Sequence, residues 1–588
     1  MLNSLVLNNF RCFGQRTTIH CAPITVMFGK NSAGKSSIIS SLLLLKQSLV
    51  TGDDEGLLRP RTERGPADLG SMREIMYGHD IDRSLEITLR CSFDRRRIGN
   101  EHPYLFPRRE TAGAIQPPEQ FTYGWTFDLA KPSRELVLTA LHVAQSDQFS
   151  AVFRRTLVPG GDEPLYALRT SANDMTIVDT VSEHAARVIH TQAENLRARL
   201  MNVEVPLENL GRLSYRLRRM IDDSGRMHDE AVRILRAAEA AESRLDDASF
   251  CRGLYLEDQA RAGFVGDGLF PTERTYQQLF PRLYDLLDWK SLGSPRDGSR
   301  GLRTSDAGLF DIVPATSQAA RCIRNTLASL VPIGPLRERP SRLYMFSGST
   351  PGDVGYDGRR VPDLLFRDPE LLHEANEWLQ KLEVPYRIEP QSLLPAGSSP
   401  EGATTGVYEL RLRDIENPNG PLVSMSDVGF GVSQILPIIA QILLSRDNLI
   451  TVEQPELHVH PGLQARLADL FIAAIKPPYR HQFIIETHSE HFALRLQKRL
   501  GEKQALCPED VSFLFVRRTG DGSRVLHIPL DEAGNLTERP PGGFFLERLQ
   551  ELQSAVGPQL PCLLLRSFAC LNRSLDRCSP AQGNCLPS

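Results

Sequence analysis

The fold of this chain is decided by one glycine-rich stretch, Gly29-Lys30-Asn31-Ser32-Ala33-Gly34-Lys35-Ser36-Ser37. It fits the pattern G-x-x-x-x-G-K-[ST], follows the apolar run Ile24–Phe28 and precedes a helical pattern over residues 36–49. In this strand, loop and helix context, the backbone N–H groups of residues 29–37 are expected to point at phosphate oxygens. Lys35 is expected to neutralise phosphate charge, and the Ser36 hydroxyl to ligate Mg²⁺. The stretch therefore predicts a site for ATP and Mg²⁺.

A second apolar run supplies the carboxylate that such a site needs. Residues 448–453 end in Glu453, which is expected to orient the metal as a Walker B strand does. Gln454 and Glu456 follow it and are candidates for handling the attacking water. Further along, residues 482–489 repeat the arrangement, and His488 is placed to reach a γ-phosphate.

A glycine-bearing turn lies between these two regions and runs into an apolar helical pattern. Such a turn presents free N–H groups and a serine hydroxyl to an anion. Glycine turns before helices are common, so the evidence comes from the position of this one shortly before Glu453. The residues assigned to this signature are Gly429, Phe430, Gly431, Ser433 and Gln434.

Length and composition limit the classes of protein to consider. The 588 residues favour several domains, at roughly 150 residues each. A balance of 68 basic and 72 acidic residues creates no global field for nucleic acid or anionic membranes, so any DNA contact must be a local patch. The ten cysteines include no C-x-x-C pair, and neither a signal peptide nor a membrane span is evident. These features predict a cytoplasmic protein that makes no membrane contact.

The order of P-loop, glycine-serine signature, E-x-P-E-x-H-x-H-P and T-H-S resembles the ABC-type ATPases of the SMC, RecF and RecN group, and especially the OLD-like ATPases. The resemblance covers roughly residues 1–80 and 330–550. Residues 9–13 look like the N-terminal NFR-x-F strand of the group, which implies that Arg11 approaches the nucleotide. Residues 334–337 and 542–545 resemble a bacterial subgroup that has a characteristic C-terminal extension and occurs in antiphage defence systems.

The resemblance implies an α/β fold, with an ABC-type P-loop ATPase head formed from both ends of the chain and a helical insertion between them. The expected organisation is an N-terminal lobe with the P-loop, a helical insertion, a mixed connecting region, a C-terminal lobe with the signature, Walker B strand and switch histidine, a C-terminal extension and a loosely ordered tail. The corresponding boundaries are 1–175, 176–265, 266–400, 401–500, 501–550 and 551–588.

The resemblance also implies a homodimer in which ATP is sandwiched, with each P-loop facing the signature turn of the other copy. Gln454 stands where relatives commonly carry a glutamate that positions water. Glutamine can orient water but cannot take a proton, so the expectation is a slow, switch-like ATPase that controls DNA sensing or a partner effector in antiphage defence.

Two alternatives stay open: a non-catalytic scaffold gated by ATP, and a DNA-repair ATPase of the RecF kind. The scattered acids after His488 indicate no embedded nuclease, so DNA cleavage would need a separate nuclease or toxin effector. Four histidines could suggest zinc, but the family motif explains most of them without metal. They are His458, His460, His488 and His491.

Overall fold

The P-loop follows a strand that is buried along its whole length. In the computed structural model, strand β3 covers Ile24–Phe28, and all of its side chains are buried. Helix α1 begins directly after the loop and covers Lys35–Leu49. A continuous apolar run is typical of a strand that is covered on both faces of a parallel sheet. The predicted strand, loop and helix are confirmed.

The chain divides into two compact units, and each is described by itself. The meander unit comprises Met1–Arg16 and Ser41–Ala328, and the P-loop unit comprises Thr17–Ser40 and Ser329–Ser588. The structure describes residues 1–49, 57–62, 65–93, 119–129, 136–145, 149–156, 165–172, 319–346, 348, 351–393, 406–429, 431–503 and 506–538.

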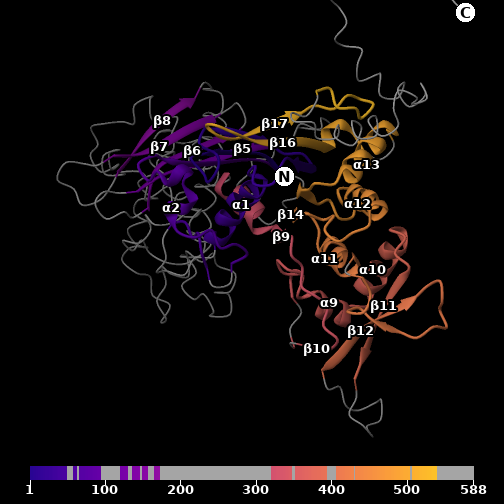
Figure 1. Ribbon diagram of the computed structural model, residues 1–588. Helices are drawn as coiled ribbons and strands as arrows, with labels where there is room; N and C mark the ends of the chain where they lie inside the picture. The colour runs from indigo at the N-terminus through magenta and orange to yellow at the C-terminus, as the bar shows by residue number, and fades with distance from the viewer. Residues whose placement is uncertain are drawn as a thin grey trace, which may run out of the picture. The chain divides into compact units, whose positions relative to one another are not determined.

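A six-stranded sheet forms the centre of the P-loop unit, in the order β17-β16-β3-β15-β14-β9. Figure 1 labels β17, β16, β14 and β9 of this sheet. Neighbouring strands from β16 to β9 run parallel, and β17 pairs antiparallel with β16. The C-terminal ends of the parallel strands therefore share one edge, where ligands bind in open α/β sheets. The strands β9, β14, β15, β16 and β17 cover Leu330–Ile333, Leu449–Glu453, Gln482–Glu486, Val511–Thr519 and Gly522–Ile528.

Three helices of this unit begin at or shortly after the predicted signature, Walker B and switch segments. The helices α11, α12 and α13 cover Gly431–Leu444, Pro461–Ala474 and Glu490–Gly501. The Ser489 hydroxyl accepts a hydrogen bond from the backbone N–H of Phe492 and caps α13. Phe471 of α12 packs edge-on against Phe483 of β15, with ring centroids 4.8 Å apart. This apolar contact fixes α12 on the sheet.

A smaller sheet in the same unit has the order β10-β12-β11, and β13 also pairs with β12. The strands β10, β11, β12 and β13 cover Tyr344–Met345, Tyr386–Ser392, Val407–Asp414 and Val423–Ser424. The remaining elements β2, α9, α10 and η6 cover Thr17–His20, Val361–Arg367, Pro369–Lys381 and Pro508–Asp510.

The meander unit is built on antiparallel strands that pair in the order β1-β4-β5-β6-β7-β8. Its core includes the fully buried rings of Tyr123 and Trp125. The elements β1, β4, β5, β6, β7, β8, α2 and η1 cover Leu2–Asn8, Leu85–Phe93, Glu119–Leu129, Leu136–Gln145, Phe149–Thr156, Leu165–Ala172, Met72–Ile75 and Tyr77–His79.

The predicted α/β fold is confirmed, with a P-loop head assembled from both ends of the chain, because β3 lies between β15 and β16. The expected helical insertion at 176–265 and the tail at 551–588 lie outside the described residues. Strands β16 and β17 fall within the span predicted as a C-terminal extension, yet they belong to the central sheet. Among the described residues, no helix is long and apolar enough to cross a membrane.

Candidate functional site

The two glycine positions of the P-loop have positive φ angles, which favour glycine. Gly29 has φ +143°, and a Cβ atom there would lie 2.2 Å from the Val516 carbonyl oxygen of β16. Gly34 also has a positive φ, of 110°. Both conformations are unfavourable for residues with a side chain, so the two glycines of the motif are required by the geometry of the loop.

Internal hydrogen bonds hold the loop in this shape. The N–H of Ala33 donates to the Lys30 carbonyl, and the N–H of Ser37 donates to the Gly34 carbonyl, each at 3.2 Å. The hydroxyl of Ser523 on β17 donates to the Ala33 carbonyl at 2.6 Å. Lys30, Asn31 and Ser32 are exposed. The outer side of the loop is thus open to solvent, while its inner side is fixed to the β16–β17 hairpin.

Lys35 is folded onto the loop and is only 3% exposed. Its Nζ donates to the carbonyl oxygens of Gly29 and Lys30, both at 3.0 Å, and lies 3.8 Å from Oε1 of Glu486. Burial lowers the pKa of Lys35, and the negative charge of Glu486 opposes this shift. The ammonium group is therefore held at the loop by oxygens that a phosphate could replace.

Glu486 belongs to this site although the sequence reasoning does not assign it. It ends β15 and is paired in register with Glu453, which ends β14. Its Oε2 accepts a hydrogen bond of 2.7 Å from the Ser36 hydroxyl. Glu486 could have been identified in the sequence as a carboxylate at the end of an apolar run, which is the feature that identifies Glu453.

Glu453 is a buried carboxylate, 8% exposed. Its Oε1 accepts a hydrogen bond of 3.0 Å from the Tyr356 hydroxyl. Burial raises the pKa of Glu453 to about 7, the charge of Glu486 adds to the rise, and the contacts with Tyr356 and Arg337 oppose it. Two carboxylates at the ends of adjacent strands form an acidic pair that a cation would stabilise.

Arg337 fixes the backbone on which Glu453 stands. Its Nη2 donates to the Glu453 carbonyl at 2.9 Å, and its Nη1 donates to the Gln454 carbonyl at 3.3 Å. Burial lowers its pKa to about 10, so the guanidinium stays charged at neutral pH. Arg337 lies in the loop after β9, and Tyr356 lies in the segment that pairs with this loop through the bond from Gly334 N–H to the Tyr356 carbonyl. Neither residue is predicted from the sequence as part of the site.

The two candidate water-handling residues differ in their surroundings. Gln454 has φ +47°, and its N–H donates to the Glu486 carbonyl at 2.7 Å. Glu456 accepts two hydrogen bonds, from the Thr487 hydroxyl at 2.7 Å and from the His488 N–H at 2.6 Å. Burial raises the pKa of Glu456. Both oxygens of Glu456 thus hold the turn that carries His488.

His488 has a buried ring nitrogen, Nε2, that has no hydrogen-bond partner in the described part of the chain. Burial lowers the pKa of His488, and the positive charge of Lys35 lowers it further. A buried polar atom without a partner is unfavourable by about 1–3 kcal/mol. An acceptor or donor on a bound ligand would relieve this cost.

The signature residues lie at the start of α11, which begins at Gly431. Ser433 and Gln434 are buried, at 7% and 3% exposure, and the Gln434 amide lies 3.4 Å from the Ser433 hydroxyl. Gly429 faces open space, and Phe430 lies outside the described residues. The glycines, rather than the two polar side chains, are accessible in this conformation.

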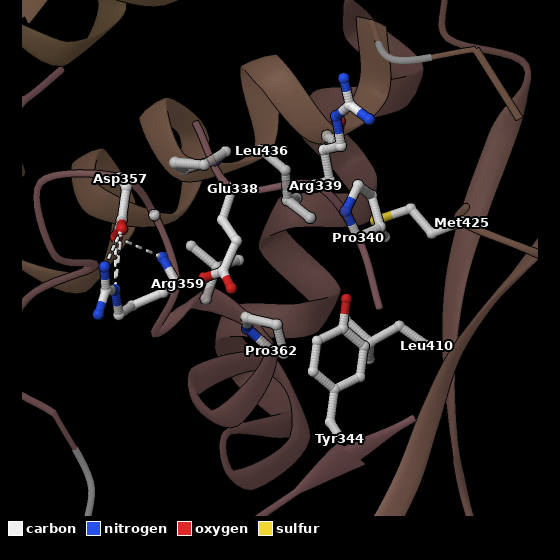
Figure 2. A pocket seen from close by; sticks show the side chains of 14 residues that line it. Glu338, Arg339, Pro340, Tyr344, Asp357, Arg359, Pro362, Leu410, Met425 and Leu436 are labelled. Atoms are coloured by element: carbon white, nitrogen blue, oxygen red, sulfur yellow. Dashed lines mark hydrogen bonds and ion pairs between the residues drawn. The ribbon is translucent and has the colours of Figure 1, made fainter. Parts of the chain in front are cut away.

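A small cavity of about 40 Å³ lies beside the start of α11 (Figure 2). Ser433 and Pro437 line it on one side, and Tyr344 and Met425 contribute to its wall. Figure 2 shows the guanidinium of Arg359 bonded to Asp357 at its rim. This volume holds a few water molecules, so the cavity does not fit a nucleotide.

Two further residues that the sequence analysis names have local backbone contacts. Arg11 belongs to the meander unit, in the turn after β1, where its N–H donates to the Ile75 carbonyl. His460 caps α12, with its Nδ1 accepting from the Gly462 N–H. Among the described residues, no group of three or more His, Cys, Asp or Glu side chains is arranged to hold a metal ion.

The residues at the edge of the sheet fit a magnesium nucleotide. Mg²⁺ is usually held by one or two carboxylates, water and phosphate oxygens, so it does not need a larger acidic cluster. Glu453, Glu486 and the Ser36 hydroxyl provide oxygen ligands of this kind. The unpartnered Nε2 of His488 and the carbonyl-bound ammonium of Lys35 suit a polyanion.

Comparison with protein families gives matches in two separate segments of the chain. Residues 327–494 match the family model described as "AAA domain, putative AbiEii toxin, Type IV TA system". Residues 1–180 match the one described as "AAA ATPase domain". Two separate segments of this P-loop α/β chain are thus similar to AAA ATPase family models. No curated protein matches it.

Solved structures similar to the chain include three SMC head domains. The Smc head of Pyrococcus furiosus with an extended coiled coil, bound to the C-terminal domain of ScpA, is 12% identical, with 94% of this chain and 99% of that chain covered and a TM-score of 0.32. The SMC head of Thermotoga maritima is 10% identical, with coverage of 90% and 99% and a TM-score of 0.31. The Smc head of Pyrococcus yayanosii with a coiled coil and joint is 13% identical, with coverage of 94% and 99% and a TM-score of 0.32. Because these TM-scores are low, the fold assignment rests on the strand order of this chain.

Proposed function

We propose that this protein binds ATP with Mg²⁺ and hydrolyses it slowly. The observation that supports this most strongly is the meeting of Lys35, Ser36, Glu453 and Glu486 at one edge of a parallel sheet. Next to them, His488 carries a buried nitrogen that is unpartnered within the described ranges. A positive side chain, paired carboxylates and an open glycine loop are what a magnesium triphosphate requires.

In the proposed complex, the N–H groups of residues 29–37 and the ammonium of Lys35 hold the phosphates. Ser36 and Glu453 hold Mg²⁺, and we add Glu486 as a carboxylate that orients the Ser36 hydroxyl. Mg²⁺ supplies positive charge that stabilises the phosphate oxygens. His488 contacts the γ-phosphate through Nε2, and Arg11 approaches the nucleotide, as the family resemblance implies.

The slow rate follows from the residues that could activate water. Both oxygens of Glu456 are engaged by Thr487 and His488, which favours a positioning role for Glu456. Gln454 then orients water without accepting its proton. Its backbone N–H bond to the Glu486 carbonyl links the water-handling position to the end of β15, whose Glu486 side chain orients the Ser36 hydroxyl.

We further propose that two copies form a homodimer around ATP. In it, the turn from Gly429 to Gln434 of each copy faces the P-loop of the other, and nucleotide binding switches DNA sensing or a separate nuclease or toxin effector. The description of the matching family as a putative AbiEii toxin of a Type IV toxin–antitoxin system supports a role in antiphage defence. A cytoplasmic location is part of the same proposal.

Binding of a fluorescent ATP analogue with Mg²⁺ tests the nucleotide site. Lys35→Ala is expected to weaken binding at least about tenfold, because the ammonium group contributes a charge-assisted contact to phosphate. The control is Lys498→Ala, which removes an exposed charge on α13. Circular dichroism checks that both variants are folded. Equal affinity of folded Lys35→Ala and wild type would refute the proposed site.

A non-catalytic scaffold is the second candidate, and Gln454 is the observation that favours it. Phosphate release from wild type and Gln454→Glu separates the two functions. A slow ATPase gives measurable release from wild type that Lys35→Ala abolishes. A scaffold gives none from wild type, although it binds ATP, and gains turnover in Gln454→Glu. Rapid turnover by wild type without any partner would contradict both.

A further inference from the structure

The β16–β17 hairpin extends past the edge of the sheet beside the P-loop. β16 is parallel to β3, and Phe515 pairs in register with Phe28, the last residue before the loop. Residues after 515 therefore run alongside the loop. The close approach of the Val516 carbonyl to Gly29 and the bond from Ser523 to Ala33 fix the hairpin to it.

The end of this hairpin carries three arginines and one acid over residues 517–524, which we call the arginine tip. Arg517 and Arg524 lie directly opposite each other across the two strands. Arg517 and Arg518 are exposed, and within the described ranges neither guanidinium has a hydrogen-bond or ion-pair partner. Arg524 lies 4.0 Å from Asp521, in an exposed pair.

This arrangement is unfavourable for the isolated chain. Like charges directly opposite in an antiparallel pair repel, as Arg517 and Arg524 do here. Adjacent residues of a strand point to opposite faces, so Arg517 and Arg518 place positive charge on both faces of the hairpin. A single phosphate would contact one face, whereas an extended polyanion can contact both.

We propose that the arginine tip binds the phosphate backbone of a nucleic acid. Guanidinium groups bind phosphate oxygens through two parallel hydrogen bonds, and cross-strand neighbours stand about 5 Å apart, close enough for successive phosphates of one strand. The overall charge of −4 means that attraction must come from a local patch, and the arginine tip is such a patch. Binding of nucleic acid at the arginine tip does not depend on the proposed ATPase function. Only its consequence, that nucleic acid would be sensed beside the nucleotide site, rests on that function.

Fluorescence anisotropy with a labelled DNA duplex and its single strand tests this contact in the full-length protein. The double variant Arg517→Ala/Arg518→Ala is expected to lose about tenfold or more in affinity and to reduce the salt dependence by about two charges. The matched control, Arg446→Ala/Lys498→Ala, removes the same charge. Arg446 precedes β14 and so lies at the N-terminal ends of the parallel strands, away from the arginine tip, and Lys498 lies on α13. The control is expected to stay within about twofold of wild type.

Three results would overturn the proposal. Wild type could bind neither oligonucleotide, the double variant could keep both affinity and salt slope, or an acidic peptide could bind to the arginine tip where DNA does not. Affinity for the ATP analogue is measured on the same samples and is expected to be unchanged in the double variant. Failure of the arginine tip is thereby distinguished from failure of the ATP site.

Discussion

At the residue scale, opposing effects act on the ionisation of the Glu453 carboxyl group when no cation is bound. It stands beside Glu486 in a buried position, where ionisation is unfavourable, yet the Tyr356 hydroxyl and the charge of Arg337 favour the ionised form. The balance leaves the pKa of Glu453 at about 7. The ionisation of one side chain should therefore be visible in the stability of the protein.

The free energy of unfolding should depend on pH through Glu453. Its pKa is about 7 in the folded chain against an ordinary 4.5, so between these values the folded state binds more protons than the unfolded state. Stability from this group is therefore lost as pH rises through that range. Glu453→Gln removes the effect and should gain on wild type by roughly 1–3 kcal/mol between about pH 5 and pH 8.

Urea unfolding without Mg²⁺ at a series of pH values measures this difference. The control is Glu416→Gln, which alters an exposed carboxylate after β12. A difference between Glu453→Gln and wild type that stays constant from pH 5 to pH 8 would show that Glu453 is not destabilised by burial.

The residues of the site differ in how far the sequence reveals them. Lys35, Ser36 and Glu453 follow from local patterns, because a glycine loop and a carboxylate after an apolar run are both visible in one stretch of chain. Arg337 and Tyr356 do not, because their roles arise when the loop after β9 pairs with residues 356–357. Glu486 ends an apolar run as Glu453 does, but only the strand order shows that the two are neighbours.

At the scale of elements, the P-loop is packed and hydrogen-bonded against the β16–β17 hairpin. Strand β3 and helix α1 are predictable from an apolar run and a helical pattern. The position of β16 beside β3 is not predictable in this way, because a parallel pairing between residues near 28 and 515 leaves no pattern in the local sequence. The fit of Gly29 against Val516 is a point of close approach between the two elements.

Gly29→Ala should disturb this fit. A Cβ atom would lie 2.2 Å from the Val516 carbonyl oxygen, and φ of +143° is unfavourable for alanine. We expect a loss of roughly 2–4 kcal/mol in stability or a displaced loop with at least about tenfold weaker binding of the ATP analogue. Gly352→Ala is the matched control, because a Cβ atom added there would have no described atom within 4 Å. Thermal unfolding and analogue binding measure both variants, and wild-type behaviour of Gly29→Ala would contradict the tight fit.

At the scale of the whole molecule, residues from both ends of the chain complete one sheet. The P-loop comes from residues 29–37, whereas the carboxylates and His488 come from residues 453–488. The sequence predicts that the two ends of the chain come together only because its motifs occur in the order typical of such ATPases. The parallel pairing of β3 with β15 shows this arrangement directly. The organisation over 173–318 lies outside the described residues and remains a prediction.

The proposed dimer makes the quaternary state depend on the nucleotide. The proposal assigns phosphate and metal binding to groups of each copy, and it assigns the remaining contact with the nucleotide to the turn at Gly429 of a second copy. Closure around a ligand stabilises only the state that binds it, so association should increase with ligand saturation. Mass photometry with Mg²⁺ and a non-hydrolysable ATP analogue should detect two chains for wild type and Lys498→Ala, and one chain for Lys35→Ala. A dimer that forms equally without nucleotide, or a single chain at saturating analogue, would exclude a nucleotide-driven switch while leaving ATP binding itself intact.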